Sequence, residues 1–267
     1  MKEVRYFYVP DAFSAGELPE EEAQHATRVL RMQPGDEMVL IDGKGVYHHA
    51  VVTEATKKRC LYRIKSSEPQ ERQWQPHLHI AMAPTKNMDR TEWFAEKATE
   101  IGVDEFTFLR CRWSERTVIK TDRIHKIVVA AVKQSHKAWM PAVNEMTDFK
   151  TFVEAVADRA SASGRKVQRF ICHCHDDVST LQLKLPLRES IRPGEDVVVM
   201  VGPEGDFSVE EVEWAQDHGF QPVSLGKSRL RTETAALVAA YLMNLANQYP
   251  SQSHCTAHPL IPTSPTS

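Results

Sequence analysis

From residue 77 onward, short apolar segments that read as buried strands alternate with segments of helical spacing. The strand-like runs cover 77–83, 106–111, 169–174, 196–201 and 222–225. This alternation is typical of an α/β domain whose mostly parallel sheet is covered by helices on both faces. Such domains bind ligands beyond the carboxyl ends of their strands, so the loops that follow these runs are the places to look for a site.

Two helices of this region are predicted with defined ends. The first spans 89–101 and has Gly102 where a C-terminal cap is expected. Its apolar side comprises Trp93, Phe94, Ala98 and Ile101. The second spans 232–249 and is Ala-rich and apolar around most of its circumference, so it needs cover on more than one face, from its own sheet and, in one interpretation, from a second subunit.

The first 65 residues predict a small β domain instead. Strand-like runs at 5–9, 37–42, 46–54 and 59–65 are separated by turn signals, and 20–31 has helical spacing with three glutamates in its first turn. The polar stretch 66–76 lacks apolar periodicity and is the predicted linker. We therefore expect domains at 1–70 and 74–249, followed by a Ser-, Thr- and Pro-rich tail at 250–267 that is predicted to be disordered.

Composition narrows the class of protein. The chain has no apolar run near the roughly 20 residues of a membrane span and no signal-peptide pattern, so we expect a soluble, cytoplasmic protein without membrane contact. Its five scattered cysteines suit reduced thiols. The net charge of −3 gives no global sign of nucleic-acid binding, but 110–137 holds a cluster of basic residues. That cluster is either an RNA contact or a solvated face balanced by acids elsewhere in the fold.

The segment 197–208 runs from a buried strand through a tight turn into a helix. Ser208 and Glu211 form a capping box at the start of that helix, and Gly202 and Gly205 allow the backbone to approach a ligand closely. Main-chain groups could therefore hold a cofactor here, although a plain strand-to-helix turn explains the same pattern. The chain lacks G-x-G-x-x-G and a complete P-loop, which argues against a phosphate-cradling site.

The segment 224–237 again runs from a strand through a glycine loop into a helix. Lys227, Arg229 and Arg231 place positive charge beside a helix N-terminus, which already favours an anion. An RNA phosphate suits this position.

Together these two loops resemble the SPOUT family that methylates N3 of a uridine in 16S ribosomal RNA of the small subunit. The resemblance covers nearly the whole chain. It rests on Gly202-Pro203-Glu204-Gly205, Leu225-Gly226, Leu230–Ala235, His25–Arg31, Lys86, Trp93, Lys97 and Glu100–Gly102. The chain departs from the usual family pattern at Asp206, Ser228, Arg229 and Lys137.

The resemblance implies a PUA-like RNA-binding β-barrel at 1–70 and, after it, an α/β SPOUT domain with a mostly parallel sheet and a C-terminal trefoil knot. It also implies S-adenosyl-L-methionine as cofactor and a homodimer. The residues that would line the cofactor pocket are Val201, Gly202, Glu204, Gly205, Leu225, Gly226, Leu230, Arg231 and Thr232.

For the chemistry, Arg231 is the candidate to stabilise the uridine anion, and Glu204 or Glu233 to accept the proton. Either carboxylate could instead serve its turn or the helix dipole. The candidate RNA contacts are Arg5, His25, Arg28, Arg31, Lys86, Arg112, Arg116, Lys227 and Arg229.

Three alternatives concern function and metal. A noncatalytic ribosome-assembly factor or a transfer-RNA methyltransferase would fit the same residues, whereas the resemblance favours 16S rRNA within the assembled small subunit. The run Cys172-His-Cys-His175 invites a zinc interpretation, but on a strand the cysteines and histidines face opposite sides. We therefore expect buried core cysteines and no metal.

Overall fold

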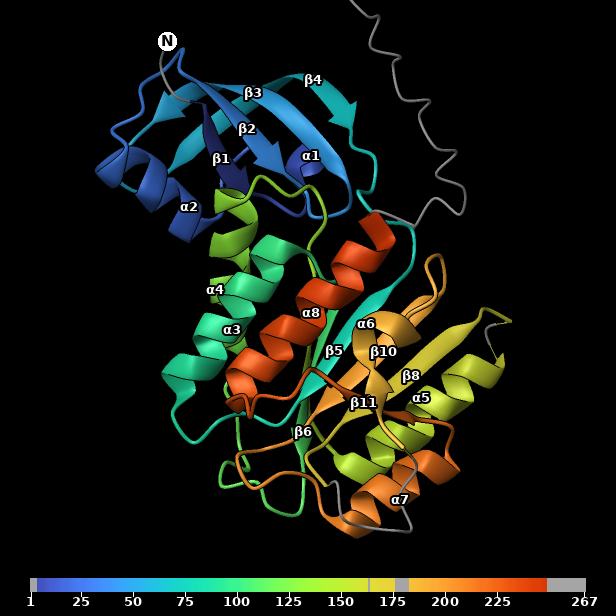
Figure 1. Cartoon of the computed structure of the whole chain (residues 1–267). Coiled ribbons are helices and arrows are strands. Elements are labelled where there is room, and N and C mark those ends of the chain that lie inside the picture. Colours follow the sequence, from blue (N-terminus) through green and yellow to red (C-terminus); the bar gives the residue numbers. More distant parts are fainter. Residues whose placement is uncertain (1–3, 163, 176–182, 249–267) are drawn as a thin grey trace, which may run out of the picture.

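The computed structural model describes residues 4–162, 164–175 and 183–248, in two domains (Figure 1). The N-terminal domain has a four-stranded sheet in the order β1-β2-β3-β4, in which β1 and β2 are parallel and the other pairs antiparallel. Its strands are β1 (Arg5–Tyr8), β2 (Glu37–Ile41), β3 (Val46–Ala55) and β4 (Cys60–Pro69). The helical segments α1 (Ala12–Ala15), α2 (Glu20–Gln24) and the π-helical η1 (His25–Val29) lie between β1 and β2.

The predicted linker at 66–76 is wrong in its first part. Strand β4 continues to Pro69 because Ser66–Pro69 pair with Val46–His49 of β3. These strand residues are exposed, so no buried side chain marks them in the sequence. The connection between the domains is therefore shorter than predicted.

The C-terminal domain has a seven-stranded sheet in which every pair of strands is parallel, as predicted for most of it. Its order is β7-β6-β5-β10-β8-β11-β9. The strands are β5 (Leu78–Met82), β6 (Glu105–Arg110), β7 (Ala142–Asp148), β8 (Val167–Cys172), β9 (Leu185–Pro186), β10 (Asp196–Val201) and β11 (Gln221–Ser224). The two edge strands, β7 and β9, were not expected from the sequence.

Helices cover both faces of this sheet. One face carries α3 (Met88–Ile101), α4 (Thr121–Gln134), α6 (Leu187–Ser190) and α8 (Thr232–Gln248), and the other carries α5 (Phe149–Ala162) and α7 (Val209–Asp217). Both faces need cover because the strands carry apolar side chains on each side. In β10, Val197 and Val199 pack with the first group of helices, whereas Val198 and Met200 pack with the second. No helix among the described residues is both long and apolar enough to span a membrane.

Trp93 corrects the predicted apolar side of α3. Phe94 and Ala98 are fully buried, but Trp93 is 43% exposed. Because successive positions on a helix are about 100° apart, Trp93 and Phe94 do not share one narrow face.

Helix α8 returns across the sheet. Strand β11 lies beyond β8, yet α8 packs on β5 and β10. The connection 225–231 therefore passes the carboxyl ends of β8 and β10, where the connection from β8 toward β9 also begins. These crossing connections shape the site.

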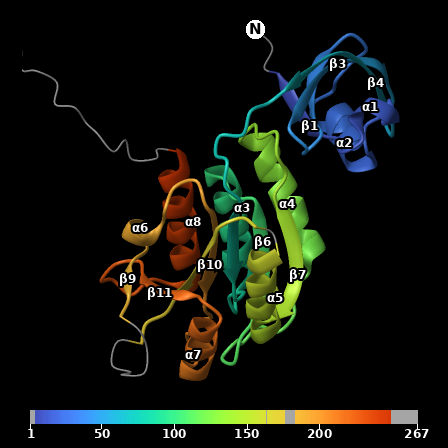
Figure 2. The same ribbon diagram turned by 90° about the vertical axis from the view of Figure 1, so that its right-hand side faces the viewer.

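The segment 136–141, here called the junction segment, belongs to the C-terminal domain and packs against the N-terminal domain. The amide of Gly45 donates to the carbonyl of Ala138 at 3.0 Å, and the amide of Met140 donates to the carbonyl of Gly43 at 3.0 Å. Gly45 has φ +102°, and a Cβ there would lie 2.3 Å from the Trp139 ring. The N-terminal domain thus sits at the amino ends of the larger sheet, next to α4 (Figure 2).

Candidate functional site

A cavity of about 1160 Å³ opens at the carboxyl edge of the large sheet. Its walls come from the connections that follow β8, β10 and β11. Eight of the nine predicted cofactor residues line it: Val201, Gly202, Glu204, Leu225, Gly226, Leu230, Arg231 and Thr232. Gly205 does not line the cavity but packs under Trp113 instead.

The loop after β10 is held in place by Asp206. This residue has φ +68°, a conformation that glycine adopts more readily. Its Oδ2 accepts from the amide of Cys174 at 2.7 Å, and its Oδ1 accepts from the amide of Phe207 at 2.8 Å. Asp206 therefore ties the loop after β10 to the loop after β8. The predicted capping box of Ser208 and Glu211 follows directly.

The loop after β11 leaves room and polar groups for a ligand. Gly226 has φ +122°, and a Cβ at this position would meet nothing within 4 Å. Within the described part of the chain, the amides of Lys227 through Leu230 make no backbone hydrogen bond. Main-chain donors on this loop remain available at the cavity wall.

The three candidate catalytic side chains share the cavity but differ in environment. Glu204 is exposed, and its Oε1 accepts from the amide of Lys86 at 2.8 Å. Glu233 is only 8% exposed and lies 3.7 Å from Arg90 Nε in the first turn of α8. Arg231 is exposed at the cavity wall. Glu233 thus has a position that also suits the helix dipole.

Several lining residues were missed in the sequence, among them His175, Lys184 and Arg90. His175 Nε2 lies 2.7 Å from the carbonyl oxygen of Phe207, so Nε2 carries a proton and donates it to this carbonyl. His175 follows β8, Lys184 comes directly before β9, and Arg90 lies in the first turn of α3. No motif marks them, because only the folded sheet brings them together.

The run from Cys172 to His175 is not a continuous core strand. Strand β8 ends at Cys172, which is buried, whereas Cys174 is exposed. Burial raises the pKa of the Cys172 thiol to about 12, so the thiol stays protonated. The expectation of two buried cysteines is therefore wrong for Cys174. Among the described residues, no group of three or more His, Cys, Asp or Glu side chains is placed to hold a metal ion.

The basic cluster at 110–137 is largely balanced by acids from other elements. Four of its side chains form ion pairs: Arg110 with Asp148, Arg123 with Glu92, Lys126 with Glu21, and Lys133 with Glu22. Lys137 lies over the Trp74 ring, and burial lowers its pKa. The interpretation in which acids elsewhere in the fold balance the cluster therefore fits the four paired side chains, whereas Lys137 is half-buried against an aromatic ring.

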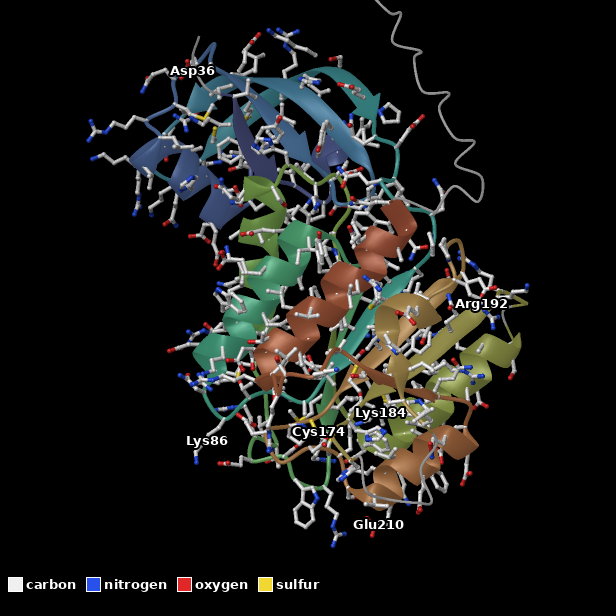
Figure 3. All side chains as sticks on the ribbon, viewed as in Figure 1. Asp36, Lys86, Cys174, Lys184, Arg192 and Glu210 are labelled. Carbon is white, nitrogen blue, oxygen red and sulfur yellow. The ribbon has the colours of Figure 1, made fainter. Side chains whose placement is uncertain are left out.

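Two predicted RNA contacts in this segment lie nearer the cavity. The Arg116 guanidinium donates to the carbonyls of Thr85 and Lys86, at 3.1 and 2.6 Å. Arg112 is exposed beside Trp113, and Lys86 Nζ pairs with Glu115 at 2.7 Å. Figure 3 shows Lys86 and Cys174 at the cavity end of the molecule and Asp36 at the opposite end.

The remaining predicted RNA contacts fall into two separate groups. Lys227 and Arg229 are exposed at the cavity. Arg5, His25, Arg28 and Arg31 are exposed on the N-terminal domain, at the far end of the molecule. One chain therefore does not bring all of these residues to a single surface.

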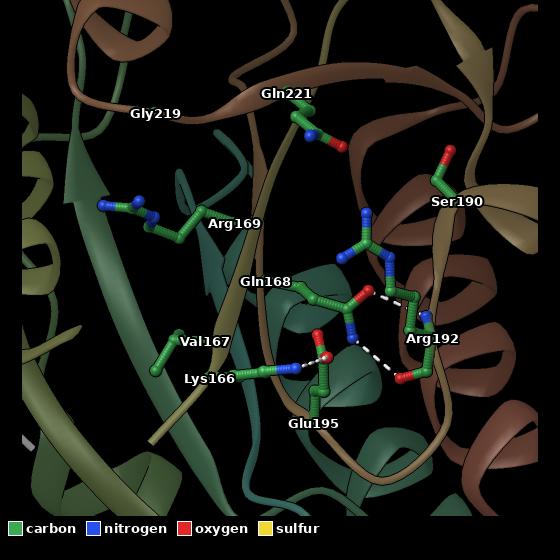
Figure 4. A pocket seen from close by; sticks show the side chains of 9 residues that line it. All are labelled: Lys166, Val167, Gln168, Arg169, Ser190, Arg192, Glu195, Gly219 and Gln221. Carbon is green, nitrogen blue, oxygen red and sulfur yellow. Dashed lines mark hydrogen bonds and ion pairs between the residues drawn. The ribbon is translucent and has the colours of Figure 1, made fainter. Parts of the chain in front are cut away.

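A smaller pocket of about 280 Å³ lies at the amino ends of β8, β10 and β11 (Figure 4). Its polar side chains are partly occupied with one another. The Gln168 amide exchanges hydrogen bonds with the backbone of Arg192, and Lys166 lies 3.7 Å from Glu195. Because α/β sheets bind ligands at their carboxyl ends, the larger cavity is the better candidate site.

Comparison with known proteins gives the same division of the chain. Residues 72–244 match the family model of the RNA methyltransferase domain, and residues 18–65 match that of the RNA methyltransferase PUA domain. The chain is 31% identical to ribosomal RNA small subunit methyltransferase E of Synechocystis over 85% of this chain and 72% of that protein. It is 30% identical to the protein of that name in Mycobacterium tuberculosis over 87% of this chain and 88% of that protein.

Solved structures match over nearly the whole chain. A probable rRNA-methyltransferase from Porphyromonas gingivalis superposes with a TM-score of 0.83 at 38% identity, covering 93% of this chain and all of that one. A ribosomal RNA small subunit methyltransferase E from Neisseria gonorrhoeae, bound to S-adenosyl methionine, gives a TM-score of 0.74 at 27% identity over 91% of this chain and 98% of that one. The predicted fold class, a SPOUT α/β trefoil-knot domain with a PUA-like domain before it, is confirmed.

Proposed function

Because this chain belongs to the RNA methyltransferase family that includes ribosomal RNA small subunit methyltransferase E, we propose that it uses S-adenosylmethionine to methylate N3 of a uridine in 16S ribosomal RNA. The observation that carries this proposal is the cavity at the carboxyl edge, where the crossing connections gather eight residues that the family pattern assigns to the cofactor. A solved relative with this architecture holds S-adenosyl methionine.

The residues of the cavity suit this cofactor. Val201 and Leu225 are apolar walls for a purine, and the unoccupied amides of 227–230 are donors for its ring nitrogens or its carboxylate. The open side of Gly226 leaves space that a Cβ would fill. We propose that these groups, with Gly202, Glu204, Leu230 and Thr232, hold the cofactor, while Gly205 supports the loop from behind.

The bound cofactor supplies an electrophilic methyl group on a sulfonium. The imide N3 of uridine carries a proton and is a poor nucleophile, so the protein has to remove that proton and stabilise the anion. We assign the anion to the Arg231 guanidinium and the proton to Glu204, whose second carboxylate oxygen is free of the Lys86 amide. Glu233 is the other candidate base, although its contact with Arg90 also fits a structural role.

The substrate has to present an unpaired base. N3 lies on the Watson–Crick edge, so the uridine must be unpaired or withdrawn from its stack to reach the cavity. Lys227 and Arg229 at the cavity, and Arg5, His25, Arg28 and Arg31 on the N-terminal domain, are the proposed phosphate contacts. The separation of these groups favours an RNA that is already folded within the small ribosomal subunit.

We further propose a homodimer formed through α8. Its outer side carries an apolar stripe of Val238, Tyr241 and Leu245, and Tyr241 is 51% exposed. Trp93 on the adjacent α3 is also exposed, so both helices carry an exposed large apolar side chain. The expected result for Tyr241→Glu is a monomer by light scattering where the wild type is a dimer. An unchanged mass would contradict this interface.

The proposed reaction is tested by incubating the protein with S-adenosylmethionine and small ribosomal subunits that lack the modification, followed by mass spectrometry of the nucleosides. We expect N3-methyluridine. A different methylated nucleoside would refute the N3 assignment, and methylation of transfer RNA alone would favour the alternative substrate. Cofactor binding without methylation of any of these RNAs would favour an assembly factor.

The catalytic assignment has its own test. Arg231→Ala should lower kcat at saturating cofactor by about 10²-fold or more while cofactor binding persists. Glu204→Gln should lower kcat by a similar factor, measured at a cofactor concentration that saturates this variant, because Glu204 also lines the proposed cofactor pocket. Glu233→Gln is the matched comparison on the same cavity wall. If Glu233→Gln alone abolished turnover, the proton would belong to Glu233.

A further inference from the structure

An exposed tryptophan stands immediately after β6. Trp113 is 53% exposed, although a large aromatic ring gains free energy from burial. The side chains beside it, Arg112 and Glu115, are exposed and charged, so Trp113 does not continue an apolar patch of the kind that binds another protein. The ring needs a different explanation.

The backbone that carries this ring is held firmly. The amide of Cys111 donates to Ser114 Oγ at 3.0 Å, and the amide of Ser114 donates to the carbonyl of Cys111 at 3.1 Å. The amide of Arg112 donates to Glu211 Oε1 at 2.8 Å. Glu211 also completes the capping box of α7, so the turn 111–114 is anchored to a helix and does not form a loose tip.

Trp113 also packs against a loop that borders the cofactor cavity. A Cβ at Gly205 would lie 3.0 Å from Trp113 Cβ and 3.7 Å from its carbonyl oxygen, so this tryptophan packs directly on the loop after β10. The neighbours of Gly205, Glu204 and Asp206, line the cavity. Gly205 thereby receives a role that the sequence did not reveal, because its missing side chain lets Trp113 approach the loop.

Positive charge completes the arrangement. The Arg112 guanidinium lies over the Trp113 ring, 5.3 Å from the ring centre, so a base would stack on the opposite face of the ring. A flat aromatic surface with an adjacent cation matches a nucleotide, because the base stacks on the ring and the phosphate meets the cation. The RNA strand has to place its uridine in the cavity. An unpaired neighbour of that uridine would then lie close to the exposed Trp113 ring.

We propose that Trp113, with Arg112 beside it, is a stacking platform for an unpaired base of the substrate RNA next to the nucleotide in the cavity. This inference deepens the proposed function, since it rests on RNA as the substrate. It assigns no step of methyl transfer to Trp113, which acts by positioning the RNA strand.

Two measurements test the platform. The first is binding of a fluorescein-labelled oligouridylate and of the same backbone with abasic residues, followed by anisotropy at one salt concentration. Trp113→Ala should weaken binding of the oligouridylate by about 10-fold or more and leave abasic binding unchanged. Trp113→Phe should retain most of the affinity, whereas Trp113→Leu, which is apolar but not aromatic, should behave like the alanine variant. Val118→Ala is the control, since Val118 is 71% exposed on the same segment.

The second measurement is kinetic, with unmodified small ribosomal subunits as substrate. Trp113→Ala should raise KM for the subunits and leave the cofactor affinity unchanged. Methylation that proceeds with an unaltered KM in the alanine variant, or equal losses with oligouridylate and abasic RNA, would overturn the platform while the proposed function stands. If the wild type methylates no subunit but the oligouridylate still depends on the Trp113 ring, the platform stands and the proposed function fails.

Discussion

At the scale of single residues, Asp206 shows how one side chain links two loops of the site. Its positive φ costs backbone energy that glycine would avoid, yet its carboxylate holds the amides of Cys174 and Phe207. We expect Asp206→Gly to weaken S-adenosylmethionine binding about 2- to 10-fold, the effect of losing a hydrogen bond, with kcat near the wild-type value at saturating cofactor. Isothermal titration measures the affinity. Asp206→Asn, which tolerates the same φ and keeps one acceptor, should lose less, and equal affinity in all three proteins would refute the link.

A second residue, His79 on β5, controls the response to acid. It is 2% exposed, and burial lowers its pKa to about 4. The unfolded chain, with a pKa near 6.5, therefore binds a proton between pH 6.5 and 4 that the native protein does not bind, so stability falls as the pH drops through this window. From pH 7.5 to 5 the His79 contribution is a loss of about 2 kcal/mol of unfolding free energy.

Urea unfolding at the two pH values measures this loss. His79→Gln keeps a polar partner for Thr107, whose Oγ1 lies 2.8 Å from the ring, but does not titrate. Its stability should therefore change less between pH 7.5 and 5 than that of the wild type. The nearby Glu105 does not mask the effect. Burial raises the pKa of this carboxyl, but the hydrogen bonds from His77 and Asn144 and the charges of His79 and His77 together outweigh burial and lower the pKa to about 2. An equal pH dependence in both proteins would assign the effect elsewhere.

At the scale of elements, α7 begins with a cap that also supports the neighbouring turn. Ser208 Oγ accepts from the amide of Glu211, and the Glu211 carboxylate accepts from the amides of Ser208 and Arg112. Ser208→Ala should cost about 1 kcal/mol and lower Tm by roughly 2–4 °C. Glu211→Ala should cost more, because the Arg112 amide also loses its partner. Calorimetry measures both, with Ser161→Ala, an exposed serine at the end of α5, as the control that should leave Tm unchanged.

The elements also show what the sequence can and cannot predict. Strands β5, β8 and β10 were predicted because their buried apolar runs follow the parallel pattern. Strand β7 was missed because it lies at the edge, with a half-exposed and partly polar sequence. In the site, Gly202, Leu225 and Gly226 were found through local motifs, whereas His175 and Trp113 were not. Their positions depend on contacts between loops far apart in the chain.

At the scale of the whole molecule, the junction segment fixes the relation of the two domains. Gly45→Ala would place a Cβ against Trp139 and should loosen this contact. Gly35→Ala is the matched control, because Gly35 also has a positive φ of +95° but nothing within 4 Å of its Cβ position. In both variants the positive φ of an alanine lowers the free energy of unfolding by about 1–2 kcal/mol. Only Gly45→Ala should also speed proteolysis near 70–76 and raise KM for small subunits. Equal behaviour of the two variants would show that the junction does not set the domain arrangement.

The position of the N-terminal domain at the amino ends of the sheet has a consequence for substrate choice. The cavity opens at the carboxyl ends, so the two regions proposed to contact RNA are separated in one chain by at least the length of a six-residue strand, roughly 20 Å. A protein built this way binds best to an RNA whose two contacted features lie at that fixed separation. Flexible RNA samples many distances between two features, whereas an assembled particle holds them at one. We therefore expect the architecture to select for a completed RNA surface, so that methylation becomes a record that the surface has formed.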